Sequence, residues 1–247
     1  MASCLEFSFR LTFALTLLIV LRLFQVIRAT HAPLASNNRG PPRRTCCSLG
    51  VFLGSGGHTG EMIRLLMGLP FDRYTPRTYI ISSGDSISKA KVLELEQSKG
   101  QGDFLFVEIP RARKVHQSFL TTPFSTLYSL VFCFWFVTLQ PIFSTRIPGR
   151  MFSEVIILNG PGSSVPIALA AFLRRFITGR PTPRLIYVES VARVKRLSLS
   201  GRLLLPFVDS FLVQWEVLKN EVTKSHSYNV LHGFKLVASI TCEGWMV

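Results

Sequence analysis

The chain has 247 residues, 48% of them hydrophobic, with a mean hydropathy of +0.34 and a formal net charge of +14. This length suits one well-buried domain with an appendage and is short for two full domains. The charge fits nucleic acid, an anionic membrane surface or a phosphate-bearing substrate, but no basic recognition helix or aromatic-lined sheet supports nucleic acid as a partner. Five scattered cysteines without CxxC spacing favour neither a disulfide framework nor a zinc site, and they fit a reducing compartment.

An apolar run near the N-terminus predicts a membrane anchor over residues 1–28. Residues 11–27 read LTFALTLLIVLRLFQVI, close to the roughly 20 residues that span a bilayer. Arg22 interrupts the run near one end, where an arginine can snorkel to the interface. A cleaved signal peptide is the alternative, but no charged region precedes the apolar core and ATHAP is a poor cleavage site. We therefore expect a single uncleaved span.

The residues on either side of this span predict its orientation. Glu6 and Arg10 precede it, and four arginines follow it: Arg28, Arg39, Arg43 and Arg44. By the positive-inside rule, the body of the protein lies in the cytosol. Residues 29–45 are rich in Pro, Gly, Ser and Asn without apolar periodicity, and they are expected to form a linker.

From residue 46 to residue 220, apolar strands alternate with helices. The expected strands cover residues 47–53, 77–82, 104–109, 153–159, 184–190 and 209–215, and the expected helices include 59–69, 86–97 and 164–177. This alternation predicts a parallel sheet covered on both faces, in one α/β domain of the Rossmann-like, doubly wound kind. Ligands of such sheets bind outside the carboxyl ends of the strands.

One apolar segment interrupts this alternation. Residues 127–143 read LYSLVFCFWFVTLQPIF, which is apolar enough for a second span. If the segment crossed the bilayer, the loops before and after it would lie on opposite sides and could not share one sheet edge. We expect a buried or membrane-dipping helix, with an ordinary core helix as the alternative.

The sequence VFLGSGGHTGE, Val51–Glu61, follows the first expected strand. Its glycines permit a turn that directs N–H groups inward, and the positive helix N-terminus that follows suits phosphate. The residues expected to bind a diphosphate are Gly54, Ser55, Gly56, Gly57 and Thr59. His58 is a candidate general base, phosphate donor or helix cap. The Lys-Ser/Thr pair of a P-loop is missing and the third glycine of a dinucleotide fingerprint is displaced, so simple strand-to-helix geometry is the alternative.

Two further loops follow the strands expected at residues 153–159 and 184–190. The residues expected to take part are Asn159, Gly160 and Gly162 in the first loop, and Glu189, Arg193 and Arg196 in the second. A solvated basic face is the alternative for the arginines. The segment RARKVHQS, residues 111–118, either adds phosphate contacts or is a surface loop. Three such loops at one sheet edge, on a membrane-tethered chain, argue jointly for a phosphorylated lipid as ligand.

Five motifs make a family resemblance specific: GSGGHTGEM, PRARKVHQS, NGPGSSVPIA, YVESVARVKRLSLSGR and FLVQW. In this order, over roughly residues 48–219 and the closing GWMV, they resemble the membrane-anchoring subunit of the two-part UDP-N-acetylglucosamine (UDP-GlcNAc) transferase that adds the second sugar to dolichol diphosphate. That family is similar in turn to the acceptor half of the bacterial enzyme that glycosylates undecaprenyl-linked muramyl pentapeptide. There a GGH loop, matched here by residues 56–58, and a His-Glu-Gln-Asn loop line the acceptor site. Glu189 aligns with the glutamate of the second loop, but Val188 and Ser190 replace its neighbours.

The resemblance implies a GT-B transferase split into two chains, with this chain as the acceptor half and inactive alone. The donor half would be a separate soluble subunit that binds UDP-GlcNAc. The acceptor would be dolichol-linked GlcNAc diphosphate on the cytosolic face of the endoplasmic reticulum membrane, with the nuclear envelope as a further location. The transferase of the first GlcNAc-phosphate step is an additional expected partner. The implied catalytic residues are His58, as base, and Glu189; no cofactor or metal is expected, because no DxD-like motif occurs.

The C-terminal part departs from the family pattern. Residues 221–243, EVTKSHSYNVLHGFKLVASITCE, intervene before GWMV, where the family runs quickly to its terminus. A genuine insertion and an error in the gene model both explain this segment. Because the family's C-terminal tail docks into the catalytic subunit, residues 221–247 are expected to be an atypical partner-docking tail.

Two functions from other classes stay open. A membrane-bound NAD(P)-dependent oxidoreductase would use the Gly54 loop, with Asp85 as the ribose ligand, although the Tyr-x-x-x-Lys pair of one such family is missing. A scaffold would recruit the soluble subunit without binding the acceptor.

Overall fold

The computed structural model describes residues 2–31, 46–113, 117–118, 120–140, 153–160, 162–227 and 238–242. The helices are α1 (Ala2–His31), α2 (Gly57–Met67), α3 (Ser86–Lys99), α4 (Thr122–Phe134), its π-helical continuation η1 (Trp135–Leu139), α6 (Ser164–Thr178), α7 (Leu199–Leu204) and α8 (Glu216–Ser227). The strands are β1 (Leu49–Leu53), β2 (Arg77–Ser82), β3 (Phe104–Ile109), β4 (Val155–Asn159), β5 (Arg184–Val188), β6 (Ser210–Val213) and β7 (Ser239–Cys242). Most of the expected linker, the centre of the segment at 111–118 and the closing GWMV lie outside the described residues.

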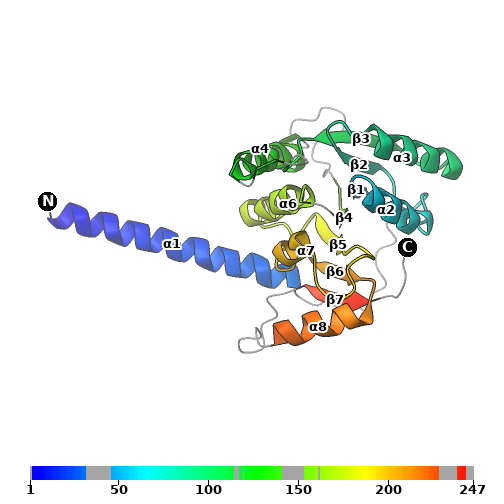
Figure 1. Ribbon diagram of the computed structural model, residues 1–247. Helices are drawn as coiled ribbons and strands as arrows, with labels where there is room; N and C mark the ends of the chain where they lie inside the picture. Colours follow the sequence, from blue (N-terminus) through cyan, green and yellow to red (C-terminus); the bar gives the residue numbers. More distant parts are fainter. Residues whose placement is uncertain are drawn as a thin grey trace.

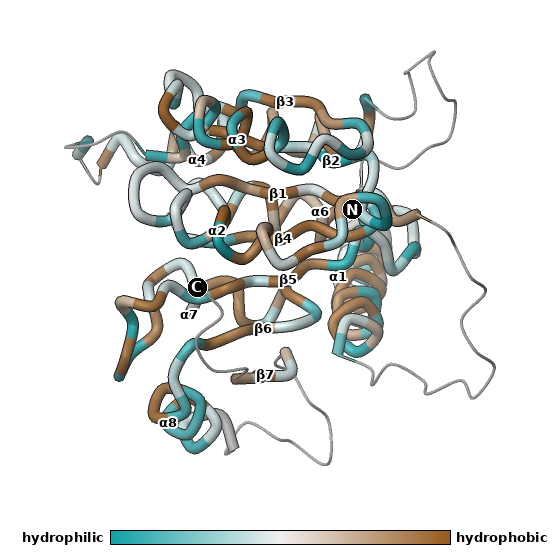
Figure 2. The backbone as a smooth tube through the Cα atoms, turned by 90° about the vertical axis from the view of Figure 1, so that its right-hand side faces the viewer, coloured by the Kyte–Doolittle hydropathy of each residue, from teal (hydrophilic) through white to brown (hydrophobic). Residues whose placement is uncertain are grey.

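The described strands form one parallel sheet in the order β3-β2-β1-β4-β5-β6-β7. Figure 2 shows them stacked in this order, mostly in the colour of hydrophobic residues. The order reverses between β1 and β4, and the crevice at the carboxyl ends of these two strands is therefore the switch point where ligands of such folds bind. The expected Rossmann-like, doubly wound α/β fold is confirmed.

The sheet separates two buried cores, and successive residues of β1 enter different ones. Val51 belongs to a cluster with side chains of α2 and α3. The next residue, Phe52, belongs to a cluster with side chains of α4, η1 and α6. Figure 1 shows α2 and α3 on one side of the sheet and α4 and α6 on the other. Because both faces are covered, the central strands are apolar at almost every position.

The expected elements agree closely with the observed ones. β2 and β3 have the expected bounds, and the other expected strands and the helices expected at 59–69, 86–97 and 164–177 are found within two residues of theirs. The helix expected over 127–143 begins earlier, at Thr122, and its described part ends with η1 at Leu139. α7, α8 and β7 were not predicted from the sequence. The expected limit at residue 220 falls inside α8, and β7 extends the sheet beyond it by pairing with β6. The domain limits 1–28, 29–45, 46–220 and 221–247 remain predictions.

The long helix α1 projects from the body of the molecule, but its last turns contact the domain (Figure 1). Over residues 7–20 it exposes large apolar side chains. Arg22, which the sequence suggested would reach the membrane interface, donates from Nε to the carbonyl of Phe176 in α6, at 2.9 Å. Arg175 of α6 donates to Oγ1 of Thr30, at 3.2 Å. Two hydrogen bonds therefore hold the end of the helix against the α/β domain.

The apolar segment after β3 forms α4 and η1. The stretch Thr122–Leu139 is long and apolar enough to cross a membrane, as is Glu6–His31. Its inner face is buried at Ser129, Cys133 and Val137, and the last two share a core cluster with side chains of α6. Its outer face exposes Phe124, Leu127, Tyr128, Val131 and Trp135. The stretch is therefore neither a fully buried core helix nor a helix separate from the domain.

Candidate functional site

A cleft with a volume of about 800 Å³ lies at the carboxyl edge of the sheet. Its walls come from the first turn of α2, from the loops after β3, β4 and β5, and from side chains of α4, α6 and α7. Of the residues expected from the sequence, His58, Gly160, Gly162, Glu189 and Arg193 line it. The other expected residues belong to these segments or directly adjoin them, but are not among those that line the cleft.

The loop before α2 leaves the N-terminus of this helix open. Gly56 precedes the helix with φ of 70°, a conformation that favours glycine. Ser55, Gly56 and Gly57 are exposed, and a Cβ built on Gly57 would meet no atom within 4 Å. The first N–H groups of a helix have no partner within it, so this end of α2 can receive an anion.

Thr59 holds this loop in shape rather than facing the cleft. Its buried hydroxyl donates to the carbonyl of Gly54 and lies 2.6 Å from Oγ of Ser88 in α3. The hydroxyl is therefore used inside the protein, and Thr59, at 1% exposure, shapes the loop from within.

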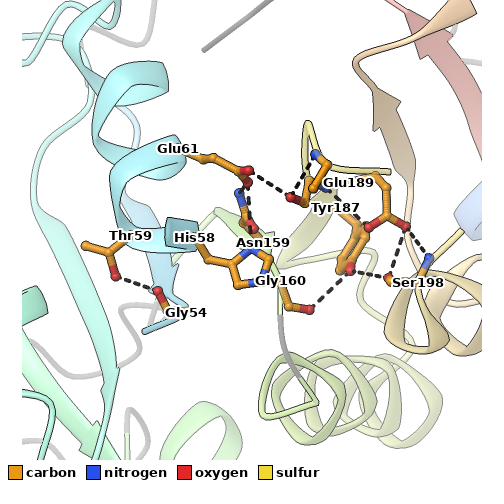
Figure 3. Close-up of polar contacts among 11 residues, drawn as sticks. Gly54, His58, Thr59, Glu61, Asn159, Gly160, Tyr187, Glu189 and Ser198 are labelled. Atoms are coloured by element: carbon orange, nitrogen blue, oxygen red, sulfur yellow. Dashed lines mark hydrogen bonds and ion pairs between the residues drawn. The ribbon is translucent and has the colours of Figure 1, made fainter. Parts of the chain in front are cut away.

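His58 lies against the loop after β4, as Figure 3 shows. A Cβ built on Gly160 would be 2.6 Å from Cγ of the imidazole, so the ring occupies space that glycine alone leaves free. The side chain is about one-third exposed, and its Nδ1 lies 3.6 Å from Oε2 of Glu61. This Nδ1 is buried and has no hydrogen-bond partner among the described residues.

Glu61 is a site residue that the sequence analysis missed. Its Oε2 accepts a hydrogen bond from Nδ2 of Asn159 at 3.1 Å, and its Oε1 accepts one from Oγ of Ser190 at 2.7 Å (Figure 3). One carboxylate therefore connects α2 to the loops after β4 and β5, next to His58. The available signal was the spacing of His58 and Glu61, because residues three apart share a helix face.

Glu189 lines the cleft, but its carboxylate is nearly fully buried. Its Oε2 accepts from the backbone N–H and the hydroxyl of Ser198, both at 3.0 Å, and its Oε1 accepts from the N–H of Ser190 at 3.2 Å. Burial raises the pKa of Glu189, and these hydrogen bonds and the charge of Arg193 offset part of that rise. The contacts organise the loop after β5; the catalytic role expected for Glu189 remains a prediction.

Tyr187 joins the loops after β4 and β5, and the sequence analysis missed it as well. Its hydroxyl donates to the carbonyl of Gly160 at 3.2 Å and lies 3.3 Å from Oγ of Ser198. Burial raises the pKa of this phenol, so the hydroxyl keeps its proton and remains a donor.

Two arginines line the cleft, and both of their charges suit an anionic ligand. Arg193 comes from the loop after β5 and Arg113 from the loop after β3. Arg196 is exposed on the same loop as Arg193 but is not among the lining residues.

The acidic residues were also considered as ligands for a metal ion or for the ribose of a dinucleotide. No group of three or more His, Cys, Asp and Glu side chains is placed to hold a metal ion in the described residues. Asp85 caps α3: its carboxylate accepts from the N–H of Ser88 at 3.1 Å and from its hydroxyl at 2.7 Å. Since this buried carboxylate is already occupied, the structure does not favour Asp85 as a ribose ligand.

These features define a class of protein: a Rossmann-like α/β domain on an apolar N-terminal helix, with a largely apolar cleft at its switch point that two arginines line. A family profile described as "Oligosaccharide biosynthesis protein Alg14 like" matches residues 49–231. The chain is 41% identical to the UDP-N-acetylglucosamine transferase subunit ALG14 of Cryptococcus neoformans, over 95% of this chain and 96% of that protein. It is 38% identical to the subunit of the same name from Rattus norvegicus, over 85% and 91%. The chain belongs to the Alg14 family.

Proposed function

We propose that this chain is the membrane subunit of a UDP-GlcNAc transferase that adds the second GlcNAc to GlcNAc-diphospho-dolichol. It presents this lipid acceptor and recruits a soluble subunit that binds UDP-GlcNAc. The observation that carries the proposal is the cleft at the switch point, which is lined by Arg193 and by His58, a residue in the first turn of α2 next to the open N-terminus of that helix. The names of the relatives support the subunit role.

The chemistry assigned to the cleft is transfer to a hydroxyl. The 4-hydroxyl oxygen of the acceptor GlcNAc attacks the anomeric carbon of the donor sugar, and the bond from that carbon to UDP breaks. His58 takes the hydroxyl proton and releases it to solvent, since a base near the acceptor lowers this barrier. The N–H groups at the start of α2 and the guanidinium of Arg193 hold the acceptor diphosphate. The departing UDP is stabilised by the soluble subunit, which completes a GT-B arrangement.

The route of the lipid follows from the apolar surfaces near the cleft. Thr122 and Thr126 of α4 and Leu199 and Leu203 of α7 line it, and the two leucines are exposed. α4, which exposes large apolar side chains, lies on the same side of the sheet as α1 (Figure 1). With α1 in the bilayer, α4 dips into the membrane surface, and the acceptor enters the cleft without leaving the lipid.

The cellular assignment rests on the same proposal. The arginines after the anchor favour a domain on the cytosolic face of the endoplasmic reticulum, with the nuclear envelope as a continuation of that membrane. The tail at 221–247 docks the soluble subunit, and the first-step GlcNAc-phosphate transferase is a further partner. Protease added to sealed microsomes should digest the domain; full protection would contradict this orientation.

Transfer assays with purified subunits test the proposed function. The full chain in detergent is incubated with UDP-GlcNAc and a polyprenyl-linked GlcNAc diphosphate, with and without the soluble subunit. We expect transfer only when both chains are present. Transfer by this chain alone would contradict the split site, and oxidation of NAD(P)H by this chain would favour the oxidoreductase.

Truncation tests the membrane contact of α4. Removing residues 1–21 deletes the projecting part of α1 and keeps the contacts of Arg22 and Thr30 with α6. We expect this truncation to retain binding to phosphatidylcholine vesicles through α4. Replacing Phe124 and Trp135 with serine in the truncated chain should release it, whereas a truncated chain that never binds vesicles would contradict the proposal.

A further inference from the structure

We infer that Glu61 is a positioning residue for His58: it orients the imidazole and selects the tautomer whose Nε2 accepts the proton. The inference rests on the proposed function and deepens it. Neither the GGH loop nor the His-Glu-Gln-Asn loop of the resembled acceptor site contains this glutamate. What points to it is one carboxylate that faces the histidine and is fixed by two other loops.

The two hydrogen bonds of Glu61 determine where its carboxylate lies. Oε1 is held by the hydroxyl of Ser190, and Oε2 is held by the amide of Asn159. Asn159 is 1% exposed and Ser190 is 6% exposed, so both donors sit in the protein interior at the carboxyl ends of β4 and β5. The carboxylate therefore has little freedom to turn towards solvent, and its Oε2 stays directed at His58.

The histidine supplies the complementary group. Its Nδ1 is buried, has no hydrogen-bond partner among the described residues, and lies 3.6 Å from Oε2 of Glu61. A proton on Nδ1 points at this oxygen, which leaves the lone pair on Nε2 for the acceptor hydroxyl. Catalytic hydrogen bonds are often long without substrate and shorten in the complex, so 3.6 Å is compatible with a contact that closes on binding.

The other side of the ring is fixed by the backbone. Gly160 allows the imidazole to lie directly on it, and the hydroxyl of Tyr187 holds the carbonyl of Gly160. With Gly160 on one side and Glu61 on the other, the ring has a defined orientation. A base in a defined orientation is already close to the geometry needed for proton transfer.

The charged groups around this pair come from several elements. Glu189 and Arg193 belong to the loop after β5 and Arg113 to the loop after β3, and all three line the cleft. The carboxylate of Glu189 is occupied by Ser198 and Ser190. Glu61 is therefore the carboxylate placed to contact the imidazole in the described site.

A double-mutant cycle in the assembled two-subunit enzyme tests the inference. Glu61→Gln keeps the size of the side chain but turns one of its two acceptors into a donor. We expect kcat to fall by about 10- to 100-fold, within the contribution of a general base, while the acceptor KM changes less than about twofold. Glu61→Asp, which retains both acceptors, should recover part of the loss. The matched control is Glu94→Gln, the same change on the exposed side of α3.

The second arm combines this change with His58→Ala. If Glu61 acts through His58, the double variant loses no more activity than His58→Ala alone. An equal loss from Glu61→Gln with either residue at position 58 would identify a structural brace and overturn the inference. Wild-type rates for Glu61→Gln would overturn it as well.

A folding defect is separated by measuring thermal unfolding and co-purification of the soluble subunit. Ser190→Ala provides a milder second variant: it removes one of the two bonds to Glu61, and kcat should fall several-fold with unchanged acceptor KM. An unchanged kcat for Ser190→Ala and Glu61→Asp, with a misfolded Glu61→Gln, would contradict the inference. Failure of the proposed function has a different signature, because the wild-type complex itself would then transfer no sugar.

Discussion

The two glycine loops at the carboxyl edge have similar sequences but different contacts. Beside Gly57, at the start of α2, a Cβ would meet no atom within 4 Å. At Gly160, after β4, φ is 82° and a Cβ would lie 2.6 Å from the ring of His58. The first glycine leaves open space next to a helix N-terminus, and the second makes room for a side chain of the first loop. Glycine-rich loops of one pattern can therefore serve a ligand or the protein itself, and the neighbouring atoms distinguish the two cases.

The largest effect is expected from Gly160→Ala. The new methyl group needs the space of the imidazole and also a positive φ, so His58 must leave its position. Transfer should fall about as far as in His58→Ala, by about 10²–10⁴-fold if the histidine is the base. The control is Gly100→Ala, which carries the same kind of strain at φ of 60° with open space around it. Normal transfer by Gly160→Ala in the two-subunit assay would refute this use of the glycine.

A smaller effect is expected from Gly57→Val. Because this position is open and its φ is not positive, the turn itself does not require glycine, and folding should change by less than about 0.5 kcal/mol. A branched side chain would instead block a diphosphate from the N–H groups of α2. Loss of one charge-assisted hydrogen bond, worth about 1.5–3 kcal/mol, should raise the acceptor KM by about 10- to 100-fold. Steady-state kinetics with varied acceptor would show this, and an unchanged KM would mean that the open space holds no phosphate.

Thr59→Val tests how the first loop keeps its shape. Valine matches threonine in size but cannot donate to the carbonyl of Gly54 or contact the hydroxyl of Ser88. Leaving these buried groups unpaired should lower the free energy of unfolding by about 1–3 kcal/mol. Because His58 rests on Gly160, transfer should fall only several-fold. Thermal unfolding in detergent checks the stability, and a variant as stable as the wild type would show that the hydroxyl does not brace the loop.

The smallest effect concerns Glu189 in the neighbouring loop. Its pKa is raised above the ordinary value of 4.5 by burial. Between pH 4.5 and the raised pKa of the folded state, Glu189 is protonated more in the folded state than in the unfolded state. The free energy of unfolding therefore falls as pH rises through this window. Glu189→Gln should remove that part of the pH dependence, measured by unfolding between about pH 4 and pH 8. An identical pH dependence in both proteins would show that Glu189 ionises without a cost.

Local patterns of the sequence were sufficient to predict most of the strands and helices of the fold. Continuous apolar runs identified β2 and β3 with their observed bounds, because both faces of the sheet are covered. The position of His58 at a strand-to-helix loop also followed from local pattern. α8 and β7 were not predicted, because the domain was expected to end at residue 220 and residues 221–247 were expected to form a partner-docking tail. The docking of α1 was missed because the hydrogen bond of Arg22 is made 154 residues away, in α6.

The centre of the site could not be predicted in the same way. Glu61 bonds to Asn159 and Ser190, which are 98 and 129 residues distant in the chain. These contacts exist only because the sheet places β4 next to β1 and β5 next to β4. The single local feature that indicated a contact was the separation of three residues between His58 and Glu61, which places both on one helix face. Thr59 was expected at the ligand, whereas its hydroxyl faces α3, because the direction of a helix's first turn is set by packing.

Photocrosslinking can determine which subunit binds the acceptor. A polyprenyl-linked GlcNAc diphosphate with a photoreactive group on the lipid, next to the diphosphate, is irradiated with the two-subunit complex in detergent. We expect labelling of this chain on peptides that line the cleft, from α4 and α7, with labelling reduced in Gly57→Val. Labelling confined to the soluble subunit would contradict acceptor presentation by this chain and leave it as a scaffold.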